Sequence, residues 1–243
     1  MKLSIAIPAY NEEKRLPEKL EPYITYLNQK FPDYEMVFID DGSTDNTLSF
    51  LNSQVMGNKR IKVIHNDKNR GRGFGMRTAV LASSGNYILE TDADLPVPPE
   101  YILEFMDILD KNPQYDILMG SREHPGSIFK LGQPPLRVFA GKVFHVIFRI
   151  FSGIKFNDVM CGFKMFRHDA AKDIFNHIYD EKYLAAAEII FVAEKFGYQV
   201  KELPIAWEDD RRSKVSVFKD TFRTLYGLLQ LRSRDLRGYY KKK

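Results

Sequence analysis

The chain has 243 residues, of which 44% are hydrophobic and 28% charged, and its formal net charge at pH 7 is +4. These values are typical of a folded globular domain and exclude a disordered segment or a fibrous repeat. The single cysteine, Cys161, excludes an internal disulfide, favours a reducing compartment and is expected to be a small buried apolar residue. No secretory leader is recognised, and no stretch reaches the roughly 18 apolar residues of a membrane span.

The first half of the sequence alternates strand and helix patterns. Short apolar runs bounded by turn residues predict strands at 3–9, 35–40, 61–66, 86–92 and 116–121. Apolar residues at helical spacing predict helices at 11–31, from Ser43 or Thr44 through Leu51, at 73–84 and at 98–112. This alternation predicts an α/β fold with a mostly parallel central sheet and helices on both of its faces.

The regular alternation of strand and helix patterns ends after Ser121. Glycines and prolines in 122–135 predict a mobile loop, and 136–153 is rich in aromatic residues. The next predicted elements are a strand at 161–166, a helix at 183–197, a strand at 199–207 and a basic amphipathic helix at 215–231. No internal repeat or linker interrupts this order, so the sequence predicts one domain with a C-terminal elaboration.

Acidic residues follow three of the predicted strands. They are Glu12, Asp40, Asp41, Asp92 and Asp94. Ligands of open parallel sheets bind beyond the carboxyl ends of the strands, so these side chains are expected at one edge of the sheet. That many carboxylates require a cation or several hydrogen-bond donors.

The stretch "TDADLP" places Asp92 and Asp94 one residue apart directly after a buried strand. A hard divalent cation, Mg²⁺ or Mn²⁺, takes carboxylate and phosphate oxygens as ligands and would neutralise this pair. The alternative is a turn in which an aspartate bonds its own backbone. The position after a buried strand favours the metal site.

Two further loops carry residues that are suited to binding a nucleotide or a phosphate. One carboxylate of Asp40 and Asp41 is placed to accept from a ribose hydroxyl or a base N–H, although a plain helix-capping turn is the alternative. The stretch "NRGRGFGMR" places Arg70, Arg72 and Arg77 beside glycines, where they can approach a phosphate. It lacks the Walker lysine pattern and a true GxGxxG, which excludes nucleotide-hydrolase and dinucleotide-binding interpretations.

Six motifs occur together in one order: "IAIPAYNEE", "IDDGSTDNT", "NRGRGFGMRTA", "TDAD", "GSR" and "CGFKMF". In this order they resemble family 2 glycosyltransferases of the polyprenyl- or dolichyl-phosphate hexose synthase type. The resemblance covers residues 3–214. The segments "CGFKMF", "KELPIAW" and "SKV" are closer to the dolichyl-phosphate glucosyltransferase branch than to the mannose branch.

The resemblance implies a GT-A fold, a nucleotide-sugar donor and inversion at the anomeric carbon. It implies one domain, 1–243, made of a nucleotide-sugar-binding half (1–121), an acceptor half (122–214) and a basic tail (215–243). The donor pocket would use Pro8, Ala9, Tyr10, Glu12, Asp40 or Asp41, Arg72 and Asp92. Asp92 and Asp94 would hold Mg²⁺ or Mn²⁺, and the catalytic residues would be Asp94, Arg122 and Glu188. The acceptor phosphate would contact Arg122, Arg211, Arg212 and Lys214.

The chain departs from the pattern of these relatives at two positions. Pro96 stands where mannose-type relatives often carry a polar residue, so fewer protein ligands for the metal are expected. Ala186 stands where relatives commonly carry an aspartate, two residues before Glu188. A sugar hydroxyl would need a general base in its place, whereas a lipid phosphate, with a second pKa of about 6, is already ionised at pH 7.

The predicted reaction is therefore transfer of a hexose from a nucleotide-sugar to dolichyl or polyprenyl phosphate. UDP-glucose is the favoured donor and GDP-mannose the second choice. Two alternatives stay open: the same fold acting on a saccharide or protein hydroxyl, and a catalytically weak nucleotide-sugar-binding protein at a membrane. Ala186 argues against the first and for the second.

The C-terminal end is basic, with eleven Lys and Arg residues against two acidic residues from Arg211 onward. Apolar and basic residues alternate in 136–151 and in 218–231, which is typical of helices that lie on an anionic membrane surface. Core or dimer helices and a solvated basic face are the alternatives. We expect a peripheral protein at the cytoplasmic face of a membrane, a possible separate membrane-anchor protein, and no nucleic-acid partner, because the rim of the sheet is acidic.

Overall fold

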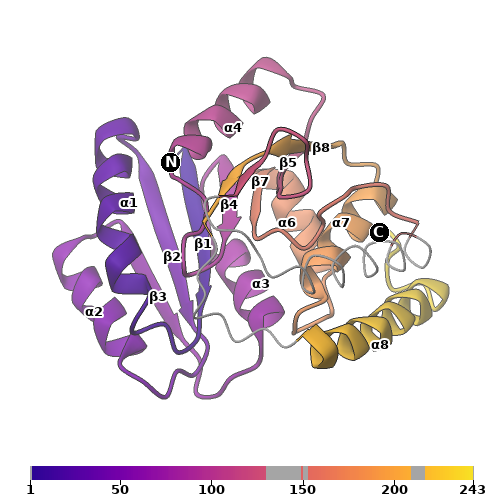
Figure 1. Cartoon of the computed structure of the whole chain (residues 1–243), viewed down its shortest axis with the longest axis horizontal. Helices are drawn as coiled ribbons and strands as arrows, with labels where there is room; N and C mark the ends of the chain where they lie inside the picture. Colours follow the sequence, from indigo (N-terminus) through magenta and orange to yellow (C-terminus); the bar gives the residue numbers. More distant parts are fainter. Residues whose placement is uncertain (1, 130–148, 150–152, 209–216, 243) are drawn as a thin grey trace.

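The computed structural model describes residues 2–129, 149, 153–208 and 217–242, apart from the side chains of 129 and 217–225. Its central sheet has seven strands in the order β3-β2-β1-β4-β7-β5-β8 (Figure 1). They are β1 (Leu3–Ala9), β2 (Tyr34–Asp40), β3 (Ile61–His65), β4 (Tyr87–Thr91), β5 (Ile117–Ser121), β7 (Phe163–Arg167) and β8 (Val200–Pro204). All neighbours are parallel except β7, which runs antiparallel to β4 and β5. The predicted mostly parallel α/β sheet is confirmed.

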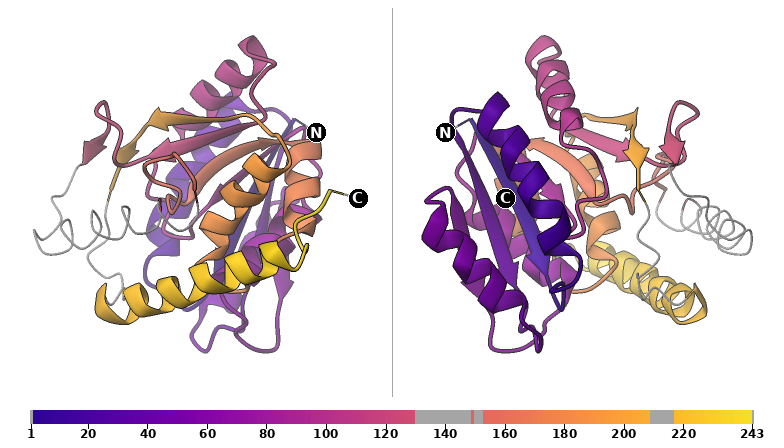
Figure 2. Two further views of the ribbon diagram at one scale, coloured as in Figure 1. Left: turned by 90° about the vertical axis from the view of Figure 1, so that its right-hand side faces the viewer. Right: turned by 60° about the vertical axis from the view of Figure 1, so that its left-hand side comes forward.

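Helices cover both faces of this sheet (Figures 1 and 2). One face packs against α1 (Leu16–Lys30), α2 (Thr47–Gly57) and α4 (Glu100–Lys111). The other packs against α3 (Arg72–Ala82), α6 (His168–Asn176) and α7 (Ala185–Lys195), with α8 (Val217–Leu236) beside them. Side chains that point alternately to the two faces of β1 explain these two layers. Ile5 and Ile7 belong to the apolar cluster on the first face, and Ala6 belongs to the cluster on the second.

The first helix begins later than its sequence pattern predicts. The pattern runs from residue 11, but α1 starts at Leu16, which is buried like Leu20 and Leu27. Residues 11–15 form a turn instead, in which Asn11 has a φ of 55° and the Glu12 N–H donates to Thr47 Oγ1 at 2.8 Å. A tertiary hydrogen bond thus takes this segment out of the helix and keeps it at the edge of the sheet.

Three further differences lie in the second half. The predicted loop at 122–135 contains β6 (Ile128–Phe129), which pairs with β9 (Ala206–Trp207) in a second, two-stranded sheet. The predicted strand at 199–207 is accordingly divided into β8 and β9. Helix α6 was not predicted.

The predicted membrane-docking segment 136–151 lies, except for residue 149, outside the described residues. No helix in the described ranges has the length and apolar character that crossing a bilayer requires.

The topology places a ligand site at one edge of the sheet. From β1 the chain passes to β2 and β3 on one side, whereas β4 lies on the other side of β1. Strands β1, β2 and β4 are parallel, so their carboxyl ends meet at this point of reversal. Open α/β sheets bind their ligands in the crevice at such a switch point.

Candidate active site

A cavity of about 430 Å³ opens at the carboxyl ends of β1, β2 and β4. Of the predicted site residues, those that line it are Pro8, Ala9, Tyr10, Glu12, Asp41, Arg72, Asp92, Asp94 and Arg122. Asp40 and Glu188 are not among the lining residues, and Arg211, Arg212 and Lys214 lie outside the described ranges. The structure therefore brings most of the predicted donor pocket together around one hollow.

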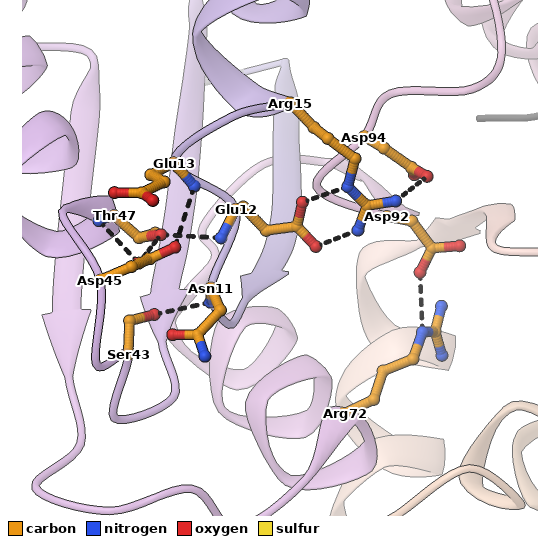
Figure 3. A network of polar contacts seen from close by, with 10 residues as sticks. All are labelled: Asn11, Glu12, Glu13, Arg15, Ser43, Asp45, Thr47, Arg72, Asp92 and Asp94. Carbon is orange, nitrogen blue, oxygen red and sulfur yellow. Dashed lines mark hydrogen bonds and ion pairs between the residues drawn. The ribbon is translucent and has the colours of Figure 1, made fainter. Parts of the chain in front are cut away.

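The carboxylate of Asp92, directly after β4, contacts an arginine from the Gly-rich loop. Arg72 Nε donates to Asp92 Oδ1 at 2.7 Å (Figure 3). Its Nη2 donates to the buried Glu90 Oε1 at 2.8 Å. Burial lowers the pKa of the Arg72 guanidinium, but the two carboxylates outweigh burial and raise it above its ordinary value. Arg72 is therefore a fixed positive charge at the cavity floor.

Asp94 has a second arginine as its partner. Arg15 Nη1 donates to Asp94 Oδ2 at 3.0 Å, and Arg15 Nε donates to Glu12 Oε2 at 2.7 Å (Figure 3). Burial, followed by the neighbouring charge of Asp92, raises the pKa of the Asp94 carboxyl to about 7 despite Arg15. Part of the positive charge that the "TDAD" stretch requires is thus supplied by the protein itself, from two arginines distant in the sequence.

The carboxylates after β2 are held by backbone N–H groups and neighbouring side chains. Asp41 accepts hydrogen bonds from the Gly71 N–H at 2.7 Å, the Arg70 N–H at 3.1 Å and Asn66 Nδ2 at 2.9 Å. It therefore fixes the Gly-rich loop that leads into α3. Both of its oxygens accept hydrogen bonds in this way, and its role as an acceptor for a ribose or a base stays a prediction.

Asp40 lies fully buried behind this loop. Its Oδ2 is 2.7 Å from Nδ1 of His65 and accepts a longer bond of 3.4 Å from the Ser43 N–H. Among the described residues, its Oδ1 has no hydrogen-bond partner. Asp40 thus supports the rim from below and does not reach the cavity.

Arg122 is held rigidly in the cavity wall. Its Nε and Nη2 donate to Asp158 Oδ2 at 2.7 Å and Oδ1 at 2.8 Å, and its guanidinium lies 4.9 Å from the ring centroid of Trp207. Burial alone would lower the pKa of Arg122, but Asp158 raises it well above its usual range. Trp207 itself lines the cavity, and its indole Nε1 is buried without a hydrogen-bond partner in the described part of the chain.

Glu188, predicted to be catalytic, does not face this cavity. It is fully buried, and its Oε2 accepts from the N–H groups of Tyr179 at 3.0 Å and Asp180 at 2.7 Å. Its Oε1 accepts from Tyr240 and Arg234 near the C-terminus. Glu188 thus accepts hydrogen bonds from four donors and is not among the cavity-lining residues, and its catalytic role stays a prediction. Ala186, two residues earlier, does line the cavity.

Sequence reasoning missed several residues of the cavity lining: Arg15, Asn69, Gly71, Met160 and Tyr183. Arg15 lies two residues after the motif "IAIPAYNEE", and Met160 directly precedes "CGFKMF". A basic residue three positions after Glu12 is the signal that could have pointed to Arg15 as a cationic partner. Tyr183 carries no local signal, because it reaches the cavity through the packing of the segment before α7.

The donor set of this site fits a hard divalent cation. Asp92 and Asp94 each use one carboxylate oxygen for an arginine and line a polar cavity. In the ranges that the structure describes, no group of three or more His, Cys, Asp and Glu residues is placed to hold a metal. A cation here would therefore take its other ligands from water or from a bound phosphate, as Mg²⁺ commonly does.

Comparisons with known proteins were made for the sequence and for the fold. The model of glycosyl transferase family 2 matches residues 4–175 of this chain. The dolichyl-phosphate beta-glucosyltransferase of Dictyostelium discoideum is 31% identical over 249 residues, which cover 98% of this chain and 76% of that protein.

Two solved structures resemble the fold. Glucosyl-3-phosphoglycerate synthase from Mycobacterium tuberculosis, in complex with Mn²⁺, UDP-glucose and phosphoglyceric acid, gives a TM-score of 0.67 at 14% identity, over 95% of this chain and 79% of that one. TarS from S. aureus gives 0.59 at 22% identity, over 94% of this chain and 65% of that one. At these identities the likeness shows the fold alone, and the GT-A fold expected from the motifs is confirmed.

Proposed function

Because this chain belongs to glycosyl transferase family 2, we propose that it transfers glucose from UDP-glucose to dolichyl or polyprenyl phosphate, with inversion at the sugar. The dolichyl-phosphate beta-glucosyltransferase of Dictyostelium discoideum, at 31% identity over almost the whole chain, supports glucose over mannose. GDP-mannose remains the second donor to be tested.

One observation carries the proposal: Asp92, Asp94 and Arg122 line the same cavity at the switch point of the sheet. A nucleotide-sugar carries a diphosphate that leaves with negative charge, and such a leaving group needs positive charge that is already in place. Arg15, Arg72 and Arg122 supply three guanidinium groups around this hollow. The lining also contains four carboxylates, Glu12, Asp41, Asp92 and Asp94, so a bound diphosphate would need a cation in addition to these arginines.

We propose that Asp92 and Asp94 hold Mg²⁺ or Mn²⁺ when the donor binds. A bound cation would offset the charge of the donor diphosphate and of the carboxylate pair. The raised pKa of Asp94 supports the proposal, since a carboxyl that ionises reluctantly is one that a cation would stabilise. The mycobacterial neighbour in complex with Mn²⁺ and UDP-glucose is a fold-level precedent only.

The acceptor is proposed to be an anion that needs no general base. Ala186 contributes only a methyl group to the cavity wall, and the Glu188 carboxylate is occupied by four donors elsewhere. A phosphate monoester, with a second pKa of about 6, arrives ionised at pH 7. Its approach to a second anion would be aided by Arg122, which Asp158 and Trp207 keep in one orientation. Arg211, Arg212 and Lys214 remain proposed contacts of the same phosphate.

The lipid part of the acceptor leads us to propose that the protein docks on the cytoplasmic face of an anionic membrane. Tyr226, Leu229 and Leu236 of α8 are 65%, 58% and 88% exposed, whereas Leu228 and Leu231 on the opposite side of the helix are buried. An exposed apolar stripe on a basic helix is typical of interfacial docking. A separate membrane-anchor protein remains a possible partner in this proposal.

The proposal is tested with the full chain, UDP-[¹⁴C]glucose and a short polyprenyl phosphate in detergent micelles. We expect a lipid-soluble labelled product in the presence of Mn²⁺ or Mg²⁺, much less product with EDTA, and less with GDP-mannose as donor. The polyprenol without its phosphate is the matched control and should stay unlabelled. Label on the alcohol would instead favour a hydroxyl acceptor, and binding of UDP-glucose without any product would favour a nucleotide-sugar-binding protein.

A further inference from the structure

The end of the described chain is tied down against α7. Helix α8 ends at Leu236, and a Gly238 with a φ of 79° turns the chain: the Gly238 N–H donates to Asp235 O, and the Tyr239 N–H donates to Arg234 O. These two bonds form a Schellman cap. They turn the next side chain inward, so that Tyr240 is only 1% exposed although it lies near the C-terminus.

Tyr240 is buried because its ring has an apolar site and its hydroxyl has a charged partner. The ring packs edge-on against Phe191 of α7, with ring centroids 5.5 Å apart, and lies 5.8 Å from the ring of Tyr179. The hydroxyl donates to Glu188 Oε1.

The same carboxylate holds a segment that is distant from the tail in sequence. Glu188 Oε2 accepts from the N–H groups of Tyr179 and Asp180, so one buried side chain joins the C-terminal tail to the segment before α7. Arg234 Nη1, at 3.3 Å from Oε1, supplies the charge that balances it. Because the four donors share one carboxylate, the loss of one changes how the other three are held.

The segment before α7 in turn caps α3. The Gly73 N–H donates to Lys182 O at 3.1 Å, and the Phe74 N–H donates to Glu181 O at 3.0 Å. The first N–H groups of a helix have no partner within the helix, so these two carbonyls fix where α3 begins. The first residue of α3 is Arg72, the partner of Asp92 at the cavity floor.

We propose that Tyr240 and Glu188 are positioning residues of the cavity: the C-terminal tail, through this one carboxylate, fixes segment 179–182 and thereby the start of α3. Neither residue lines the cavity. Their effect travels through the hydrogen bonds to Gly73 and Phe74, which directly follow Arg72, and along the chain to Tyr183, a lining residue. The donor-affinity measurement used to test this inference rests on the proposed function, whereas the hydrogen-exchange measurement does not.

The test compares Tyr240→Phe with Tyr239→Phe in the full-length protein. Both changes remove one hydroxyl and keep the ring, but Tyr239 is half-exposed and its ring only contacts Tyr179 edge-on. Amide hydrogen exchange is measured in peptides covering 70–76 and 179–184, and UDP-glucose affinity is measured by calorimetry. For Tyr240→Phe we expect about five-fold faster exchange in both peptides and about three-fold weaker donor binding. Tyr239→Phe should match the wild type in both.

Unchanged exchange at Gly73 and Phe74 in Tyr240→Phe overturns the inference, and so does faster exchange with unaltered donor affinity. A fall in melting temperature without these local changes would mean that the tail only adds stability. If Tyr240→Phe does not fold, Arg234→Gln removes a different donor from the same carboxylate and is judged by the same readouts. If the wild type binds no UDP-glucose, the proposed function fails and the exchange data alone decide this inference.

Discussion

The carboxylates that follow β2 and those that follow β4 lie at the same edge of the sheet but are held in different ways. Asp41, after β2, accepts hydrogen bonds from the backbone N–H groups of Arg70 and Gly71. Asp92 and Asp94, after β4, bond to the side chains of Arg72 and Arg15. A backbone donor cannot move without refolding the loop, whereas an arginine side chain can change rotamer.

This difference separates two kinds of carboxylate at one edge of the sheet. The oxygens of Asp41 accept hydrogen bonds from the Gly-rich loop, so Asp41 fixes the shape of that loop. Asp92 and Asp94 each accept from an arginine side chain, and they are the pair that we propose to hold the cation. A buried acidic residue next to a cavity is therefore not evidence of catalysis until its partners are known, as Glu188 also shows.

The largest effect is expected at Asp94. Asp94→Asn keeps the shape and removes the charge, so we expect sugar transfer to fall by about 100-fold or more, because the cation that we propose to offset the charge of the leaving diphosphate loses a carboxylate ligand. The free energy of unfolding should stay the same or rise slightly, since one of two neighbouring like charges is gone. Steady-state transfer and urea denaturation measure the two quantities. Full activity, or a large loss of stability, would break the contrast between the two strand ends.

At Asp41 the opposite pattern is expected. Asp41→Asn puts an amide donor against the N–H groups of Arg70 and Gly71, and leaving a buried donor unpaired costs about 1–3 kcal/mol of unfolding free energy. Urea denaturation measures this cost. The exposed Asp67→Asn, in the same loop region, is the matched control and should be neutral. A neutral Asp41→Asn with normal transfer would show that the loop is held by other contacts.

The smallest effect concerns a third carboxylate, Glu35 near the start of β2. It is buried and accepts hydrogen bonds from Ser4 Oγ and Ser84 Oγ, both at 2.7 Å, while Lys62 Nζ lies 2.6 Å from it. Burial by itself raises the pKa of Glu35, but these donors more than offset it and lower the pKa to about 2.

Because the folded-state pKa of Glu35 lies below its unfolded value of about 4.5, ionised Glu35 stabilises the fold fully above pH 4.5. That contribution should be lost progressively as the pH falls towards 2. Glu35→Gln should therefore unfold more easily at pH 7 and show a shallower dependence of unfolding free energy on pH between 4.5 and 2. Identical slopes for the two proteins would place the pH dependence in other carboxylates.

The spacing of apolar residues was sufficient to predict the sheet and most helices. A short apolar run marks a strand and a spacing of three to four residues marks a helix, and both patterns are local in the sequence. The prediction failed where tertiary contacts decide the outcome. Residues 11–15 continue the pattern of α1, but the bond from the Glu12 N–H to Thr47 removes them from the helix. Helix α6 was overlooked although Ala170, Ala171, Ile174 and Phe175 show the spacing of a buried helix face.

The site was predicted only in part, because some of its features follow from local motifs and others from tertiary contacts. Motifs ending parallel strands are brought together by topology, so Glu12, Asp41, Asp92 and Asp94 meet as predicted. Side-chain pairing across the fold has no local signature, so the bond between Arg15 and Asp94, which are 79 positions apart, was not predicted. Glu188 was placed in the site by resemblance to known relatives. Its side chain contacts Tyr240 of the C-terminal tail, and no local sequence pattern predicts where that tail packs.

The reversed direction of β7 has a practical consequence for anyone redesigning this protein. Because β7 is antiparallel to β4, it begins at the edge of the sheet where β4 ends, and Met160, three residues before β7, lines the cavity there. The fit is tight there: a Cβ added to Gly162 would lie 2.1 Å from Asp92 Oδ2. Libraries aimed at acceptor choice should therefore vary Met160 in this entry loop, leave Gly162 alone, and spare the exit of β7 at Arg167, which lies at the far edge of the sheet.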